Sequence, residues 1–312
     1  MRVLLAITLT WLLTACSPVG TTYNGQAGAS NGYTQTPSPF PSPFPGPLPA
    51  PGPGPGANPF AVTPLKLGAL GDSITRAFNI NQFNVENPLF SFSTGDSLAT
   101  SVINRLKIKM QQNGWPVNAA SYNYAVSGET VLGANSTFAA QATVLATASP
   151  YMVTVAIGSN DLCQGFLTNA AAQMQFRDRV VTSLRALTLS ANPPKVIFLG
   201  SIPRVSALTQ IPELAAAPLC LQAWPLLCPN LQIGQAAFDA QWAAANQSLA
   251  QAAATLGATV IYDGGAVGGT VLTVADVSAV DCFHPSVNGQ GKLAMAVWTT
   301  VQARINQLLP AP

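Results

Sequence analysis

The stretch MVTVAIGSND, residues 152–161, is a run of apolar and β-branched residues that ends at a glycine followed by polar side chains. Such a run is typical of a strand buried on both faces of a parallel sheet. We therefore predict a buried strand over residues 152–157 that ends at Gly158. The polar residues behind it, Asn160 among them, then follow the carboxyl end of the strand.

Short apolar runs and helical segments alternate through the rest of the domain. Further strands are predicted at residues 66–70, 119–126, 195–199 and 258–262, and helices at residues 96–112, 138–149, 169–190, 235–256 and 289–309. Five repetitions of strand and helix favour an α/β fold, a five-stranded parallel sheet with helices on both faces. In such sheets, ligands bind outside the carboxyl ends of the strands. Ser73, Gly128 and Asn160 each follow a predicted strand, so we expect them on that edge.

The N-terminus has the pattern of an export signal. Arg2 is followed by an apolar run over residues 3–13, which is too short to span a bilayer, and then by Leu13-Thr14-Ala15-Cys16. The tetrapeptide resembles the lipobox of bacterial lipoproteins, in which the cysteine is acylated. We predict a lipoprotein signal peptide over residues 1–16 with lipidation at Cys16; an ordinary secretory signal is the alternative. The protein is then exported to the bacterial cell envelope, lipid-anchored in the outer membrane, or secreted.

Residues 17–64 are predicted to be a linker. Proline occupies every second position over residues 37–55, which biases the backbone to polyproline II and a semi-rigid spacer. Residues 65–312 are long enough for one sizeable core and form the predicted folded domain. Charged residues make up 8% of the chain and the net charge is +2, a balance that gives no electrostatic footprint for nucleic acid. Nothing in the sequence indicates the oligomeric state.

Four cysteines fall in the domain, and in an oxidising compartment an even count indicates two disulfides. Three connectivities are possible. We predict Cys220–Cys228, which closes a short loop, and Cys163–Cys282. No C-x-x-C pair or histidine cluster indicates a metal site.

His284 is the only histidine of the chain, and Asp281 stands three residues before it. This spacing lets the carboxylate reach Nδ1 of the ring and leaves Nε2 for a serine hydroxyl. Ser73, in Gly71-Asp72-Ser73-Ile74, is the candidate nucleophile, because a serine needs such a base to become reactive. Each residue also has a structural reading: a lone histidine can cap a helix, and Gly-Asp-Ser is a common helix start.

Two further residues could stabilise an oxyanion. Gly128 exposes a bare backbone N–H after a strand, although a glycine there can mean only a turn. The Asn160 side chain could donate to the same oxygen, although it could equally cap the next helix. Asp72 and Asp161 are competing carboxylates, but neither shares a local turn with His284.

Taken together, these blocks resemble the SGNH (GDSL-type) hydrolases. The matching blocks are Gly71-Asp72-Ser73-Ile74, Asn123-x-Ala125-x-x-Gly128, Gly158-x-Asn160-Asp161 and Asp281-x-x-His284. Asn160-Asp161-Leu162-Cys163 and Asp281-Cys282-Phe283-His284 look more narrowly like the phospholipase-B-like branch. The resemblance implies Ser73 as nucleophile, His284 as base and acid, and Asp281 as its orienter. It also implies an oxyanion hole from the Ser73 and Gly128 N–H groups and the Asn160 amide, a flavodoxin-like three-layer α/β/α sandwich, and no metal or organic cofactor.

The segments 201–234 and 78–92 are long for plain connections and could line the cleft. The first is rich in leucine and could cover an acyl chain, or it could be a satellite core. We expect hydrolysis of lipid-like or simple acyl esters. The alternatives are deacetylation of an envelope or plant polysaccharide, and a non-catalytic envelope-binding lipoprotein.

Overall fold

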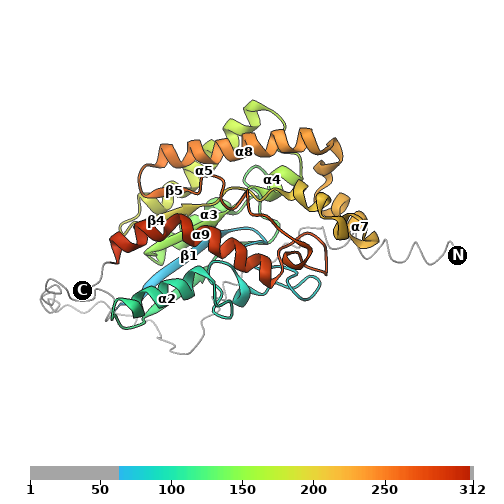
Figure 1. Cartoon of the computed structure of the whole chain (residues 1–312). Coiled ribbons are helices and arrows are strands. Elements are labelled where there is room, and N and C mark those ends of the chain that lie inside the picture. Colours follow the sequence, from blue (N-terminus) through green and yellow to red (C-terminus); the bar gives the residue numbers. More distant parts are fainter. Residues whose placement is uncertain (1–62, 310–312) are drawn as a thin grey trace, which may run out of the picture. The chain divides into compact units, whose positions relative to one another are not determined.

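A parallel sheet of five strands forms the centre of the computed structural model, which describes residues 63–309 (Figure 1). The strands are β1 (Leu65–Gly71), β2 (Ala119–Asn123), β3 (Met152–Ala156), β4 (Val196–Leu199) and β5 (Val260–Tyr262). Their order in the sheet is β2-β1-β3-β4-β5, and every neighbouring pair is parallel. This is the flavodoxin-like order, so the predicted fold class is confirmed.

Helices cover both faces of the sheet. One face packs against α3 (Phe138–Thr147), α5 (Ala170–Thr188) and α8 (Gln235–Leu256), and the other against α2 (Val102–Gln112) and α9 (Val287–Leu308). Strand β4 shows why two cores form: Ile197 and Leu199 belong to the first apolar cluster, whereas Val196 and Phe198 belong to the second. Alternate side chains of a strand point to opposite faces, and both faces here are apolar. The result is the predicted three-layer α/β/α sandwich.

Some boundaries differ from the predictions. The helix predicted from residue 96 begins at Val102, because Ser101 caps it by accepting the Asn104 N–H. The strand predicted over residues 119–126 ends at Asn123, and α4 (Ser159–Cys163) was not predicted. The remaining short helices are η2 (Pro88–Phe90), η3 (Val205–Gln210), α6 (Pro212–Ala215), α7 (Pro218–Leu227), η4 (Pro229–Ile233) and η5 (Val274–Asp276).

The predicted disulfide pairing is wrong. The bonds are Cys163–Cys228 and Cys220–Cys282, with Cα–Cα distances of 4.2 Å and 5.2 Å. Cys220 lies near the start of α7 and Cys228 directly after its end. Eight residues of helix separate two Cα atoms by about 12 Å, too far for a disulfide. The segment around α7 is instead tied at one end to α4 and at the other to the turn that carries His284.

Among residues 63–309, the structure contains no helix that is both long and apolar enough to cross a membrane. The predicted signal peptide, lipidation site Cys16 and linker lie outside these residues, apart from the last two residues of the linker. Those assignments stay predictions.

Candidate active site

The strand order places the candidate site at one point of the sheet edge. Strands β1 and β3 are neighbours although β2 lies between them in sequence, so the chain direction across the sheet reverses here. In open α/β sheets, ligands bind outside the carboxyl ends of the strands at this point. Ser73 follows β1 by two residues and Asn160 follows β3 by four. Ser73 and Asn160 therefore both follow strands that meet at this switch point.

The turn that carries Ser73 requires a glycine. Gly71 has a φ of +139°, and a Cβ on it would lie 2.0 Å from the carbonyl oxygen of Ala156. After it, the Asp72 carboxylate accepts the N–H of Ile74 at 3.0 Å. The carbonyl of Ser73 accepts the N–H of Phe78 at 3.0 Å. The serine is therefore held in a tight turn directly behind the strand.

Ser73, His284 and Asp281 form one chain of hydrogen bonds. Oγ of Ser73 lies 2.8 Å from Nε2 of His284, and Nδ1 of His284 lies 2.6 Å from Oδ2 of Asp281. All three side chains are buried, with exposed fractions of 7%, 6% and 4%. The tautomer that fits both contacts carries its proton on Nδ1, where Asp281 accepts it, and leaves Nε2 to accept from the serine.

Asp281 is held as an anion. Its Oδ1 accepts the backbone N–H groups of Phe283 and His284, both at 3.0 Å, and Oδ2 accepts the Asn79 amide at 2.7 Å. Burial acts to raise the pKa of the Asp281 carboxyl, but the hydrogen bonds from His284 and Asn79 and the charge of His284 hold it below its ordinary value. The carboxylate therefore remains charged opposite the imidazole.

A short hairpin presents the histidine. Val277 and Pro285 form an antiparallel bridge, and the N–H of Ser278 donates to the carbonyl of His284 at 2.8 Å. The rings of Phe78 and Phe283 contact the imidazole edge-on, with centroids 5.2 Å and 5.3 Å away. These contacts restrict the rotation of the ring.

Three candidate N–H donors follow the carboxyl ends of β1, β2 and β3. Within residues 63–309, the backbone N–H groups of Ser73 and Gly128 have no protein acceptor. Gly128 has a φ of +79°, a conformation that favours glycine. The Asn160 amide donates one hydrogen to the carbonyl of Glu129 at 2.9 Å, which leaves its second N–H for another acceptor.

Asp161 binds the loop that follows Gly128 and makes no hydrogen bond to His284. It is fully buried, and its carboxylate accepts the N–H groups of Val131 and Leu132 at 2.7–3.0 Å. Burial raises the pKa of Asp161 to about 6, although these backbone hydrogen bonds lower it. Together with the Asn160 bond, this contact ties the loop that carries Gly128 to α4.

The family of the chain follows from a comparison with family models. Residues 67–297 match the model described as GDSL-like Lipase/Acylhydrolase. The chain belongs to this family. The resemblance stated from the sequence blocks is thereby confirmed at the level of the GDSL/SGNH family, and with it an esterase or acylhydrolase activity.

Similar solved structures are distant in sequence. A lipase/acylhydrolase from Enterococcus faecalis is 17% identical, with a TM-score of 0.46 over 77% of this chain and 96% of that chain. A family 3 carbohydrate esterase from Clostridium thermocellum is 19% identical, with a TM-score of 0.46 over 78% and 98%. A carbohydrate acetylesterase family member from Sinorhizobium meliloti is 16% identical, with a TM-score of 0.48 over 78% and 98%. No curated protein matches the chain.

Asn79 is a residue of this GDSL-family site that sequence reasoning missed. It lies in the long segment 78–92, and besides its bond to Asp281 its side-chain oxygen accepts the N–H of Asn84. Its carbonyl also accepts the Ser278 hydroxyl. The segment therefore supports the histidine turn, where the sequence indicated only that it could line the cleft. Asn79 has a φ of +54°, and an asparagine in a long insertion is the one signal that could have marked it.

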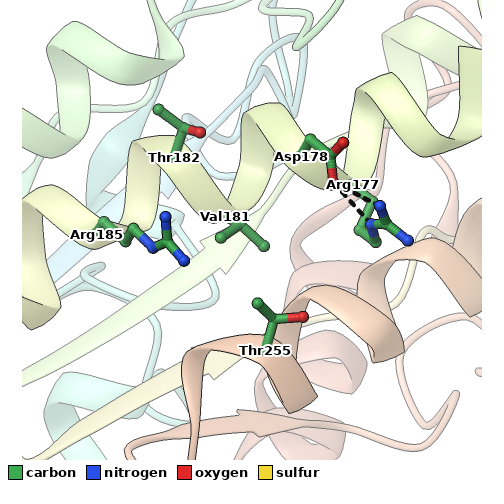
Figure 2. Close-up of a pocket in the computed structure, with 6 residues that line it drawn as sticks. All are labelled: Arg177, Asp178, Val181, Thr182, Arg185 and Thr255. Carbon is green, nitrogen blue, oxygen red and sulfur yellow. Dashed lines mark hydrogen bonds and ion pairs between the residues drawn. The ribbon is translucent and has the colours of Figure 1, made fainter.

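A groove away from these residues lies between two helices. It has a volume of about 390 Å³, lies between α5 and α8, and is lined by Arg177, Asp178, Val181, Thr182, Arg185 and Thr255 (Figure 2). Thr255 stands at the end of α8, which leads into the start of β5, so the groove lies toward the amino ends of the strands. Ser73 lies at their carboxyl ends. In the described part of the chain, no three His, Cys, Asp or Glu side chains are grouped so that they could hold a metal ion.

Proposed function

We propose that this GDSL-family protein hydrolyses carboxylic esters, with lipid-like or simple acyl groups, through an acyl-enzyme on Ser73. The observation that carries the proposal is the buried chain of hydrogen bonds from Ser73 through His284 to Asp281. It joins a nucleophile, a base and an orienting carboxylate at the switch point of the sheet. This arrangement can activate a serine hydroxyl near neutral pH.

Acylation begins when Oγ of Ser73 attacks the ester carbonyl carbon while Nε2 of His284 takes the hydroxyl proton. The carbonyl oxygen becomes an oxyanion, and the imidazolium is stabilised by the Asp281 carboxylate. The C–O bond to the alcohol then breaks, and the proton on Nε2 passes to the leaving alkoxide. The products of this half are the free alcohol and an ester on Ser73.

The oxyanion is stabilised by the N–H groups of Ser73 and Gly128 and the second N–H of Asn160. These donors are fixed before substrate arrives, so they require little reorganisation when the charge develops. Asn160 is held by its bond to Glu129, and the Gly128 loop is held by Asp161. Hydrolysis of the acyl-enzyme repeats the same steps, with a water molecule as nucleophile and Ser73 as leaving group.

The surroundings support an apolar acyl group. Phe78 and Phe283 flank the imidazole, and α7, whose Leu219 and Leu221 are about half exposed, is bonded to the same turn through Cys220. The exposed leucines of α7 are the feature that favours an acyl chain, because acyl chains need an apolar surface whereas aromatic rings also suit sugars. The Asn160–Cys163 and Asp281–His284 blocks support a place in the phospholipase-B-like branch.

We further propose that the protein is an exported lipoprotein, with the lipid on Cys16. The proposal rests on the lipobox-like sequence at residues 13–16. The two disulfides are compatible with export, since such bonds persist in oxidising compartments.

The test is hydrolysis of p-nitrophenyl esters from acetate to palmitate by the purified protein and by Ser73→Ala. We expect a rate optimum at medium or long chains, and a loss of kcat of about three orders of magnitude or more in the variant. Ser190→Ala is the control, because Ser190 follows α5 at the amino side of the sheet. Activity on acetate alone would redirect the proposal to acetylated polysaccharides. Activity that survives in Ser73→Ala would refute it.

A further inference from the structure

The peptide unit between Cys282 and Phe283 lies inside the acid–base pair, between Asp281 and His284. Cys282 has a φ of +57°, in the left-handed region that residues other than glycine rarely adopt. The N–H of this unit, on Phe283, donates to Oδ1 of Asp281 at 3.0 Å. The orientation of the unit therefore decides how the carboxylate is held.

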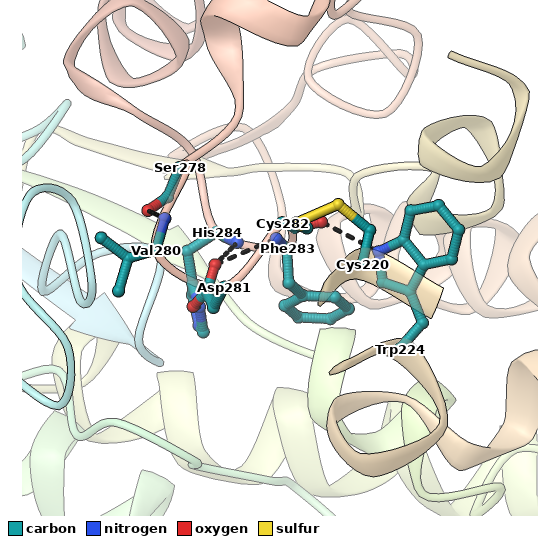
Figure 3. Close-up of a disulfide and its surroundings, with 8 residues drawn as sticks. All are labelled: Cys220, Trp224, Ser278, Val280, Asp281, Cys282, Phe283 and His284. Atoms are coloured by element: carbon teal, nitrogen blue, oxygen red, sulfur yellow. Dashed lines mark hydrogen bonds and ion pairs between the residues drawn. A yellow bond between two sulfur atoms is a disulfide. The ribbon is translucent and has the colours of Figure 1, made fainter. Parts of the chain in front are cut away.

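The other end of the same peptide unit is held from α7. The carbonyl of Cys282 accepts the indole N–H of Trp224 at 2.9 Å, and the Cys282 side chain is bonded to Cys220 (Figure 3). Trp224 is buried, with 6% of its surface exposed. A buried hydrogen bond of this kind is expensive to lose, because the carbonyl would be left without a partner.

We propose that Trp224 is a positioning residue of the esterase, which fixes the Asp281–His284 pair through the Cys282–Phe283 peptide. The inference rests on the proposed function. Rotation of this peptide would turn its N–H away from Asp281, but the indole and the carboxylate hold it at both ends. Because Trp224 belongs to α7, the segment predicted to cover the cleft also sets the geometry of the base.

Trp242 offers a matched control. Its indole N–H donates to a backbone carbonyl, that of Ile202, at 2.7 Å, as the indole of Trp224 does to Cys282. Trp242 lies on α8, and its acceptor is not part of the histidine turn. A substitution that removes either indole N–H therefore removes the same type of bond, but only one of the two bonds touches the Asp281–His284 pair.

The experiment compares Trp224→Phe and Trp242→Phe in the full protein. We expect Trp224→Phe to lower kcat about three- to tenfold on the best p-nitrophenyl ester while KM changes less than about twofold, since one hydrogen bond is lost away from the substrate. Trp242→Phe should keep kcat within about twofold of the wild type. Unfolding midpoints are measured for both, and kcat is compared at a temperature where both are folded.

A second readout does not depend on activity. His284 is the only histidine, so the proton on its Nδ1 gives a single resonance in spectra of protein labelled with ¹⁵N-histidine. We expect this low-field signal to weaken or move in Trp224→Phe and to be unchanged in Trp242→Phe. Equal kcat and an unchanged signal in Trp224→Phe would overturn the inference. Wild-type protein without Ser73-dependent activity would refute the proposed function, and the resonance would still decide the role of Trp224.

Discussion

Asp72, next to Ser73, is a buried carboxyl group with too few hydrogen-bond donors around it to stabilise a negative charge. The side chain is buried, and one oxygen accepts the N–H of Ile74 while the other, Oδ2, has no partner among the described residues. Burial raises the pKa of Asp72 to about 7, and the hydrogen bond from Ile74 and the charge of His284 offset this only in part. An ionised Asp72 therefore destabilises the fold next to the nucleophile.

Asp72→Asn should change how stability depends on pH. In the unfolded chain the carboxyl titrates near pH 3.9, so between about pH 4 and pH 7 the unfolded state binds fewer protons than the folded state. Wild-type stability thus falls as pH rises through this window, by up to about 4 kcal/mol, and the neutral amide lacks this fall. Denaturant unfolding of both proteins at pH 4, 5.5 and 7.5 measures the difference. Asp178→Asn, on the exposed face of α5, controls for the loss of a negative charge; a constant difference between Asp72→Asn and wild type would contradict the argument.

The candidate residues that could be predicted from the sequence stand in short local motifs. Ser73 and the Asp281–His284 pair stand in short blocks, and the structure joins them in one chain of hydrogen bonds. Their catalytic roles remain predictions. Asn79 and Trp224 could not be found in this way, because each reaches the histidine turn from a distant part of the sequence, 202 and 58 residues away.

At the scale of elements, α9 connects the nucleophile turn to the body of the molecule. Gln290 is completely buried near the start of this helix. Its amide donates to the carbonyl of Ile74 and its oxygen accepts the N–H of Phe92, both at 2.8 Å. One side chain thus satisfies two backbone groups in the irregular segment between β1 and α2.

Gln290→Met keeps the approximate volume of the side chain but removes both bonds. We expect a loss of about 2–5 kcal/mol in the free energy of unfolding, since the Ile74 carbonyl and the Phe92 N–H are left buried without partners. Urea denaturation of the variant measures this loss. Gln302→Met, on the exposed side of α9, should change stability by less than about 0.5 kcal/mol. Similar losses in the two variants would show that Gln290 does not act through its buried hydrogen bonds.

Most elements could be predicted because their periodicity is strong. All five strands, and the helices α3, α5, α8 and α9, lie within a few residues of the predicted ranges. The incorrect predictions have local causes. Helix α2 begins later than predicted because Ser101 caps it, and α4 is too short for its sequence to have a helical periodicity. The helices within residues 201–234 were not predicted. Pro218 stands at the start of α7 and Pro225 inside it, and proline is unusual within a helix, so the sequence does not have a clear helical pattern.

At the scale of the whole molecule, the connectivity of the disulfides could not be predicted from the sequence. Four cysteines allow three connectivities, and the choice depends on tertiary distances. The real bonds interlock, because Cys220 and Cys228 lie at opposite ends of α7 and pair with different partners. They tie the segment around α7 both to α4, which carries Asn160, and to the turn that carries His284. Asn160 and His284 are thus linked through the segment around α7.

Removal of either bond should destabilise the protein to a similar degree. The paired cysteines are 65 and 62 residues apart in sequence, and loops of this length are expected to contribute about 4 kcal/mol each by restricting the unfolded chain. The variants are Cys163→Ala with Cys228→Ala, and Cys220→Ala with Cys282→Ala. Guanidinium unfolding monitored by circular dichroism gives their free energies.

The two losses should also be nearly additive. The loops closed by the two disulfides, residues 163–228 and 220–282, overlap only over residues 220–228. One disulfide therefore hardly changes the length of chain that the other disulfide closes. All four substitutions together should therefore cost about 8 kcal/mol, a large part of the 5–15 kcal/mol that stabilises a typical domain. The fourfold variant is expected to be largely unfolded or close to its midpoint at 25 °C. A fourfold variant no less stable than either pair would mean that native contacts around α7, and not the restriction of the unfolded chain, hold this segment in place.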